Sequence, residues 1–422
     1  MIKNFKLNLK KRRITKKLRD RAELRKLDTK PITSSNQTET CFHNATIYTG
    51  FSVMENCALL IKGHKIIDIF SEERFKTKKF KENTRHIDLK GGIIVPGFID
   101  THLHGIEGHG TEDHSSTAIL EMSKSLIKYG VTSFIPTLYS APKESLKKDI
   151  RAIVSAIGRE KGSTILGIHL EGPFISPERL GVQKENGISP VNKSLMEELW
   201  KESKGHIINM TVAPEIKNMR KLALYCVEKG IVLQAGHTNA TYEQMVEGMQ
   251  CRIMHSTHLF NAMSRMHHRD PGAVGAIFIQ PEMSCEVIAD GIHINPNIIK
   301  FLIQSKPIDK LVLITDSLKP TKQKTSPLIA NGEEVYFDKC FLRKSDKTIA
   351  GSSLTMIDGF KNLIAFGLTI DQAVRMSSTN PANIMRIEHK GTIAPGYDAD
   401  LAIMDNKFNL KYTVVNGKIF DF

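Results

Sequence analysis

Apolar, β-branched runs recur along the chain, and most of them end in a histidine or a carboxylate. The first run, residues 93–101, continues directly into His102-Leu103-His104. Further runs of this kind span residues 131–138, 164–170, 207–212, 231–236, 252–257, 285–292 and 310–315. Short apolar runs that are bounded by turn residues indicate buried strands. The sequence therefore predicts eight buried strands between residues 93 and 315.

Stretches with helical apolar spacing separate most of these strands, as in residues 196–200, 219–227 and 298–303. An alternation of eight strands with helices predicts an α/β fold of the (β/α)8, TIM-like type, with a parallel barrel. In such a barrel the carboxyl ends of all the strands meet at one rim. Residues that are far apart in the sequence are therefore expected to converge there.

Both ends of the chain carry a second set of short strand patterns. These patterns cover residues 45–50, 58–61 and 65–69 near the start, and residues 399–405 and 412–419 near the end. Within the last of them, Asn416-Gly417 is a strong hairpin signal. We infer that residues 41–92 and 386–422 pair into one small β domain beside a barrel formed by residues 93–385.

Composition is consistent with this organisation. A chain of 422 residues with 41% hydrophobic residues can build a barrel and a smaller domain. No apolar stretch is long enough, or free enough of charge, to span a bilayer. The six cysteines are scattered and form no C-x-x-C pair, so neither a disulfide framework nor a thiolate zinc site is indicated. A reducing, cytoplasmic setting is the simplest interpretation.

The charge of the chain is concentrated at its start. The formal net charge is +14, and residues 1–30 hold thirteen Lys and Arg against three acidic residues, a net of +10. The body gives no reason to expect nucleic-acid binding. The leader, residues 1–40, is expected to be disordered or a basic amphipathic helix that contacts an acidic membrane, nucleic acid or an unknown partner. We favour a disordered or artefactual extension over these alternatives.

Candidate metal ligands stand at the ends of the predicted strands. His102 and His104 are two residues apart, so on a strand they point to the same face and can hold one divalent ion. Glu171, His237 and His258 each follow a different strand. A lone histidine is usually a core residue that is hydrogen-bonded locally. His169 and His255 lie within their strands, and we expect them to be such core residues or to support the ligands from behind. Ligand-type residues at several strand ends make that explanation improbable for the whole set.

Eight segments of the chain resemble the amidohydrolase superfamily, and within it the N-acetylglucosamine-6-phosphate deacetylase family. They read PGFIDTHLHG (96–105), GIHLEGPFISPE (167–178), APE (213–215), GHTNATY (236–242), THLFNAMS (257–264), ADGIHINP (289–296), ITDS (314–317) and GSSLTM (351–356). Residues 380–405 are similar to an ending that many amidohydrolases share. The resemblance covers roughly residues 41–420. It implies a barrel, a small β-sandwich built from both termini, and commonly a homodimer.

The resemblance also implies a role for each candidate residue. Glu171, His237 and His258 occupy the family's main metal-ligand positions, and His102 with His104 matches a pair that holds a second ion in some members. One or two divalent ions per subunit are expected, with Zn, Fe, Mn and Co all possible. Such an ion polarises a carbonyl and activates water. Asp316 follows the eighth strand and matches the general base and acid.

Substrate contacts follow from the same resemblance. His293 matches a residue that polarises the amide carbonyl or binds a sugar hydroxyl. Asn261 and Ala262 match a contact to the substrate phosphate, and Arg269 matches a phosphate-binding arginine, for which a guanidinium is suited. Many members carry a phosphate-contacting histidine where this chain has Gln183. That residue can donate a hydrogen bond but brings no charge.

The function implied is hydrolysis of the N-acetyl amide of N-acetyl-D-glucosamine 6-phosphate, which gives D-glucosamine 6-phosphate and acetate. The expected partner is therefore a small amino-sugar phosphate. One alternative is a related amidohydrolase that acts on another N-acyl amine or on a cyclic amide. A second alternative is a non-catalytic binding protein on a retired barrel, although such a protein would need none of the metal and acid–base residues.

Overall fold

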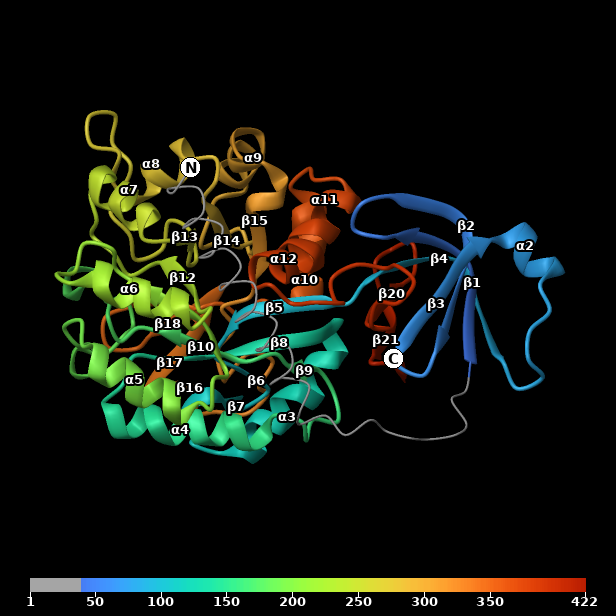
Figure 1. The fold of residues 1–422 in the computed structure, drawn as a ribbon, viewed down its shortest axis with the longest axis horizontal. Helices are drawn as coiled ribbons and strands as arrows, with labels where there is room; N and C mark the ends of the chain where they lie inside the picture. Colours follow the sequence, from blue (N-terminus) through green and yellow to red (C-terminus); the bar gives the residue numbers. More distant parts are fainter. Residues whose placement is uncertain (1–38) are drawn as a thin grey trace, which may run out of the picture. The chain divides into compact units, whose positions relative to one another are not determined.

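The structure, a computed structural model, describes residues 39–422, which form a parallel barrel and a separate β-sheet domain (Figure 1). What we inferred for the basic leader concerns residues that lie almost wholly outside this range. Among the described residues, the first strand is β1, which starts at Glu39 and includes Cys41, the first residue expected in the small β domain. No helix among the described residues is long and apolar enough to cross a membrane.

Eight parallel strands form the barrel, in the order in which they occur along the chain. They are β5 (Phe98–Leu103), β8 (Val131–Leu138), β10 (Ile168–Glu171), β11 (Ile207–Val212), β12 (Val232–Ala235), β13 (Ile253–Ser256), β14 (Ser284–Ile288) and β15 (Leu311–Ile314). The ring is nearly closed, because the backbone N–H after β15 at Asp316 donates to the carbonyl of His102 on β5 at 2.9 Å. The predicted fold class is confirmed.

One helix follows each barrel strand. In order these helices are α3 (Ser116–Leu126), α4 (Lys143–Ala156), α5 (Lys193–Glu202), α6 (Met219–Glu228), α7 (Tyr242–Gln250), α8 (Gly272–Ile279), α9 (Pro296–Ser305) and α10 (Met356–Ala365). Several start at side-chain caps that the sequence supplies. Ser115 accepts from the N–H of Ala118, and Thr241 forms a capping box with Gln244. The shorter helices α11 (Ile370–Val374) and α12 (Asn380–Ile384) complete the set.

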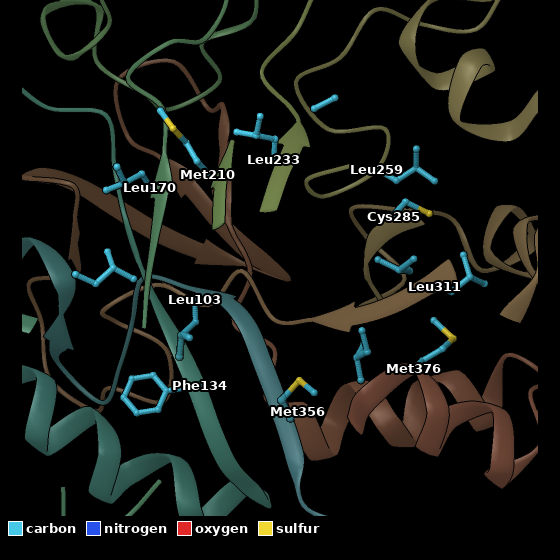
Figure 2. Close-up of a cluster of buried hydrophobic side chains, with 14 of the residues drawn as sticks. Leu103, Phe134, Leu170, Met210, Leu233, Leu259, Cys285, Leu311, Met356 and Met376 are labelled. Carbon is cyan, nitrogen blue, oxygen red and sulfur yellow. The ribbon is translucent and has the colours of Figure 1, made fainter. Parts of the chain in front are cut away.

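Alternation along the barrel strands separates an apolar layer from a polar one. Figure 2 shows the apolar layer, which combines strand residues such as Leu103, Leu170 and Leu233 with Met356 from α10. The residue next to each of these strand positions is polar and also buried, as His102, His169 and Gln234 are. Successive side chains on a strand point to opposite faces. The polar set is therefore turned into the barrel, where the candidate site is built.

The ends of the chain pair into one β domain, as predicted, and its strands form a single seven-stranded sheet. Its strands are β1 (Glu39–Tyr48), β2 (Val53–Lys62), β3 (Lys65–Ser71), β4 (Arg85–Pro96), β20 (Leu401–Met404), β21 (Leu410–Val415) and β22 (Lys418–Asp421), and the short helix α2 (Glu72–Thr77) follows β3. The predicted hairpin turn joins β21 to β22, and both Asn416 and Gly417 have positive φ, at 47° and 78°. In the sheet order, β4 lies between β1 and β20, so strands from the two chain ends flank it.

The first apolar run is divided into two strands that belong to different sheets. Residues 93–101 were expected to form a single barrel strand, but β4 ends at Pro96 and β5 begins at Phe98. Ile93 pairs with Thr46 of β1, so residues 93–96 extend the small sheet. Between the two strands lies Gly97, where a Cβ would come within 2.1 Å of the Thr132 side chain. Glycine permits this close approach, and the chain passes here from one sheet to the other.

A further four-stranded sheet lies between β15 and α10. It consists of β16 (Ile329–Ala330), β17 (Glu333–Asp338), β18 (Cys340–Arg343) and β19 (Ile349–Gly351). Its buried side chains, Val335 and Phe341 among them, pack with Tyr139 and Leu318, which follow barrel strands β8 and β15. This sheet therefore covers the carboxyl-terminal rim of the barrel next to those two strands.

Candidate active site

Three candidate ligands converge where the strands β10, β12 and β13 end. The Oε1 atom of Glu171 lies 3.1 Å from Nε2 of His237 and 3.1 Å from Nε2 of His258, and the two nitrogens are 3.2 Å apart. All three side chains are buried. We call these residues the primary triad. The structure thus brings together three residues that the sequence separates widely.

The hydrogen bond of His237 fixes the form in which its ring faces the triad. Its Nδ1 lies 3.0 Å from the carbonyl oxygen of Arg179 and must carry the proton, because a carbonyl can only accept. When the ring is neutral, its Nε2 therefore presents a lone pair to Glu171 and His258. Lone pairs that face one another at these distances repel, and a divalent cation among them removes the repulsion. The donor set of one carboxylate and two imidazoles therefore fits a hydrolytic metal.

The other two candidate ligands, His102 and His104, lie beside the triad and share Glu171 with it. We call them the histidine pair. Nε2 of His104 is 3.3 Å from Oε2 of Glu171, and Nε2 of His102 is 3.5 Å from Oε1. Nε2 of His102 has no hydrogen-bond partner although it is buried. The pair and Glu171 form a second group that could hold an ion.

Electrostatics in this cluster favour ionised carboxylates and charged rings. Burial alone would raise the pKa of Glu171, but His102 and His237 outweigh it and hold the pKa well below its usual range. Burial likewise opposes the charged ring of His102. There the carboxylates of Glu286, Glu171 and Asp316 prevail and raise the pKa well above its usual value. The cluster therefore concentrates negative charge that positive charge must balance, whether it comes from protons or from metal.

Glu286, a fully buried carboxylate on β14, supports both groups and was not among the predicted site residues. Its Oε2 accepts from Nδ1 of His102 at 2.9 Å and from the backbone N–H of His258 at 3.1 Å. Its Oε1 accepts from Gln234 at 3.1 Å. A carboxylate behind a ligating histidine fixes the ring's tautomer and orientation. The sequence did carry a signal for Glu286, because it is an acidic residue within an apolar strand. Burial of an unpaired charge is costly, so such a residue is expected to have partners.

Asp316 lies at the rim next to the histidine pair. Its Oδ1 is 3.5 Å from Nε2 of His102 and 3.5 Å from Nε2 of His104. Its backbone adopts φ 49°, and its carbonyl accepts from the N–H of Ser352 at 3.0 Å. Its side chain is 13% exposed, whereas that of Glu171 is 3% exposed. Asp316 is therefore the carboxylate of the cluster that is most open to a small molecule.

The predicted substrate contacts are distributed less tightly. Nδ1 of His293 lies 2.6 Å from Asp290, and its buried Nε2 has no partner. The amide of Asn261 turns back to the carbonyls of His258 and Leu259, and Ala262 follows it with φ 50°. Arg269 is exposed in the loop before α8, where its guanidinium lies 3.0 Å from Nε2 of His268. No contact in the described residues joins Arg269 to the primary triad.

Gln183 lies beside the primary triad, and its amide is engaged there. Its Nε2 donates to Oε2 of Glu171 at 2.5 Å, and its Oε1 accepts from the N–H of Ser140 at 2.8 Å. The residue is only 3% exposed. We had expected a phosphate contact at this position, but the structure brings the side chain to a candidate metal ligand. The sequence around Gln183 resembles a surface loop, so it gave no signal of the contact with Glu171.

His169 and His255 are core histidines, as expected. The ring of His169 is held between the hydroxyls of Thr137 at 3.1 Å and Thr211 at 2.9 Å. Nδ1 of His255 lies 2.7 Å from the hydroxyl of Ser284. Burial lowers the pKa of His169 well below its usual value, so its ring is neutral. Neither residue belongs to either group of candidate ligands.

A nearly closed barrel with ligand-type residues at its carboxyl rim defines the class of protein. Residues 93–420 match the sequence model of the amidohydrolase family, and the chain belongs to that family. Among its relatives, the N-acetylglucosamine-6-phosphate deacetylase of Haemophilus influenzae is 32% identical over 383 residues, which cover 89% of this chain and 97% of that protein. The corresponding protein of Bacillus subtilis is 33% identical over 382 residues, covering 88% and 95%.

Solved structures of the same kind are similar along nearly their whole length. The crystal structure of the N-acetylglucosamine-6-phosphate deacetylase of Pasteurella multocida has a TM-score of 0.85 and 31% identity, and the match covers 91% of this chain and all of that one (100%). The match to this structure therefore includes both the barrel and the sheet domain.

Proposed function

We propose that this protein hydrolyses the N-acetyl amide of N-acetyl-D-glucosamine 6-phosphate, which yields D-glucosamine 6-phosphate and acetate. The observation that carries the proposal is the convergence of Glu171, His237 and His258 with Asp316 at one rim of the barrel. Relatives that are named for this activity align with about nine tenths of the chain.

The primary triad would hold a divalent ion, and the histidine pair with Glu171 would hold a second one. Such an ion supplies a Lewis acid that polarises an amide carbonyl and acidifies water. Other residues of the chain orient the ligand side chains. Arg179 and Glu286 hold the ring nitrogens of His237 and His102 so that the opposite nitrogens face Glu171. Zn, Fe, Mn and Co are all compatible with imidazole and carboxylate ligands.

Asp316 would act as the general base and then as the general acid. Its carboxylate accepts a proton from the attacking water and returns it to the departing amine nitrogen. The exposed fraction of this side chain and its position beside the histidine pair support the assignment. The left-handed backbone at Asp316 is held between β5 and Ser352, so the carboxylate is positioned by two neighbouring segments.

His293, Asn261, Ala262 and Arg269 would bind the substrate. Asp290 accepts from Nδ1 of His293, so Nε2 of the neutral ring can accept from a sugar hydroxyl, and Nε2 of the protonated ring can donate to the amide carbonyl. Arg269 forms no ion pair with any described residue, so its guanidinium is available to a phosphate. We include Asn261 and Ala262, three and four residues after His258, because they match the family's contact to the substrate phosphate.

A combined assay tests this function. Purified protein is analysed for metal, and acetate release is measured on N-acetylglucosamine with and without the 6-phosphate. We expect at least one ion per chain and strong preference for the phosphorylated sugar. His237→Ala should lose metal and activity together, whereas His64→Ala, an exposed histidine in the sheet domain, should change neither. Absence of acetate release from metal-loaded wild type on both sugars would contradict the proposed reaction.

We also propose that the protein is a homodimer of the cytoplasm. An exposed apolar surface on and beside α8 and α9 supports the first part: Phe301 is 50% and Ile279 is 56% exposed, and the Phe301 ring stacks on that of Phe278. Six free cysteines are consistent with a reducing compartment. Light scattering after size-exclusion chromatography tests the mass, and Phe301→Glu should shift a dimer toward monomer.

A further inference from the structure

The amide of Gln183 has one orientation that its neighbours allow. The N–H of Ser140 points at one end of the amide at 2.8 Å, and a backbone N–H can only donate, so that end is the oxygen. The other end, Nε2, therefore donates to Oε2 of Glu171 at 2.5 Å. Because the side chain is buried, water does not compete for either bond.

Ser140 ties the same two residues together a second time. Its hydroxyl donates to the backbone carbonyl of Glu171 at 2.8 Å. This approach requires a glycine after Glu171, because a Cβ on Gly172 would lie 2.0 Å from the Ser140 hydroxyl. The loop of Gln183 is itself closed by a bond from its N–H to the carbonyl of Leu180 at 2.9 Å. Ser140, Gln183 and Glu171 thus form a closed set that joins three segments.

The two oxygens of Glu171 consequently have different surroundings. Oε1 faces the nitrogens of His237 and His258, each at 3.1 Å. Oε2 receives the Gln183 amide and lies 3.3 Å from Nε2 of His104. A free carboxylate can rotate about its last bond and exchange its oxygens. One that is held by an amide donor at Oε2 cannot do so without breaking that bond.

We infer that Gln183 is a positioning residue of the proposed metal centre, which fixes Glu171 so that its Oε1 is presented to His237 and His258. This inference rests on the proposed metal-dependent function and replaces the expected contact of Gln183 with phosphate. Partners of metal ligands of this kind typically contribute about 10–100-fold to metal affinity. The donor N–H is the required chemical feature, since it is what distinguishes Oε2 from Oε1.

Metal binding, rather than turnover, tests the inference. Zn²⁺ affinity of metal-free protein is measured by competition with a chromophoric chelator, and the visible spectrum is recorded with Co²⁺. Two variants lack the donor: Gln183→Met, which is similar in length, and Gln183→Glu, which keeps an acceptor for Ser140. Gln183→His retains a ring N–H donor. Glu185→Met, at an exposed position two residues along the same loop, is the matched control.

We expect Zn²⁺ affinity to fall about 10–100-fold in both donor-lacking variants, with an altered Co²⁺ spectrum. Gln183→His should recover most of the affinity, and Glu185→Met should behave as wild type. Affinity within about twofold of wild type in Gln183→Met, or equal losses in Gln183→His and Gln183→Glu, would overturn the positioning role. Should Gln183→Met fail to fold, the comparison of Gln183→Glu with Gln183→His decides.

The wild-type protein separates this inference from the proposed function. Wild type that binds Zn²⁺ but releases no acetate contradicts the reaction and leaves the role of Gln183 standing. Wild type that releases acetate while Gln183→Met retains wild-type Zn²⁺ affinity supports the reaction and overturns the role of Gln183.

Discussion

The backbone N–H of Asp316 donates to the carbonyl of His102 at 2.9 Å, which places the proposed proton-transfer residue beside a candidate metal ligand. This bond joins the end of β15 to β5, the last strand of the barrel to the first. The distance between the Asp316 carboxylate and the rings of the histidine pair therefore depends on closure of the barrel. A change that opens the barrel between β15 and β5 would therefore also move Asp316 away from the histidine pair.

Asp316→Asn should lower kcat by about 10²–10⁴-fold, the usual contribution of a general acid–base group. The amide is nearly isosteric with the carboxylate but neither accepts the proton of water nor protonates the departing amine. Metal content should remain that of wild type, whereas His237→Ala should lose metal. Metal stoichiometry and kcat are measured on both variants. A metal-free Asp316→Asn protein would show that Asp316 is chiefly a ligand.

Arg269→Ala should mainly raise KM for the phosphorylated sugar. A charge-assisted contact contributes about 1.5–3 kcal/mol, roughly ten- to hundredfold in affinity, and it is present in ground and transition states alike. Arg265→Ala, an exposed arginine of the same loop, is the control and should change little. Kinetics are compared on the sugar with and without phosphate. Equal effects on both sugars would refute a phosphate contact.

Lys390→Met should lower the free energy of unfolding by about 3–5 kcal/mol, the usual cost of leaving a buried charge unpaired. The Lys390 ammonium forms ion pairs with Asp398 and with Asp400, whose side chain is only 4% exposed. Urea denaturation measures the change. Lys407→Met removes an exposed lysine nearby and should have little effect. Similar losses in both variants would show that the buried ion pair contributes nothing special.

Asp290 should contribute stability that disappears in acid. Burial alone would raise its pKa, but the hydrogen bond and charge of His293 outweigh it and lower the pKa below its usual value near 4. A lowered folded-state pKa means that the contribution is present above about pH 4 and is lost as the pH falls through the folded-state value. The difference in Tm between metal-free wild type and Asp290→Asn should therefore be largest near neutral pH and shrink toward pH 3. A difference that is constant across this range would contradict the assignment.

Local patterns were sufficient to predict the barrel and most of its candidate ligands. Glu171, His237 and His258 each follow an apolar run directly, and the parallel topology alone determines that strand ends meet. The division of the first run at Gly97 was not predictable in this way. Residues on both sides are apolar and β-branched, and only their pairing with distant strands, such as Ile93 with Thr46, separates them.

Contacts behind the ligands were also beyond the reach of sequence patterns. Gln183 lies in a loop between Val182 and Lys184, and its burial against Glu171 depends on how that loop closes over β10. Glu286 could have been singled out as a charge within an apolar strand, but its partners come from β5, from β12 and from the segment after β13. Side chains that support a site through long-range hydrogen bonds leave no spacing signature along the chain.

The position of β4 between β1 and β20 has a consequence for synthesis of the protein. One edge of β4 can pair as soon as the first strands have left the ribosome, but its other edge must wait until residues 401–404 emerge after the entire barrel. At about 5–20 residues per second, this wait is on the order of tens of seconds. An apolar strand edge that is open for so long is a template for intermolecular pairing. Nascent chains truncated before residue 401 should therefore aggregate more readily than the completed polypeptide.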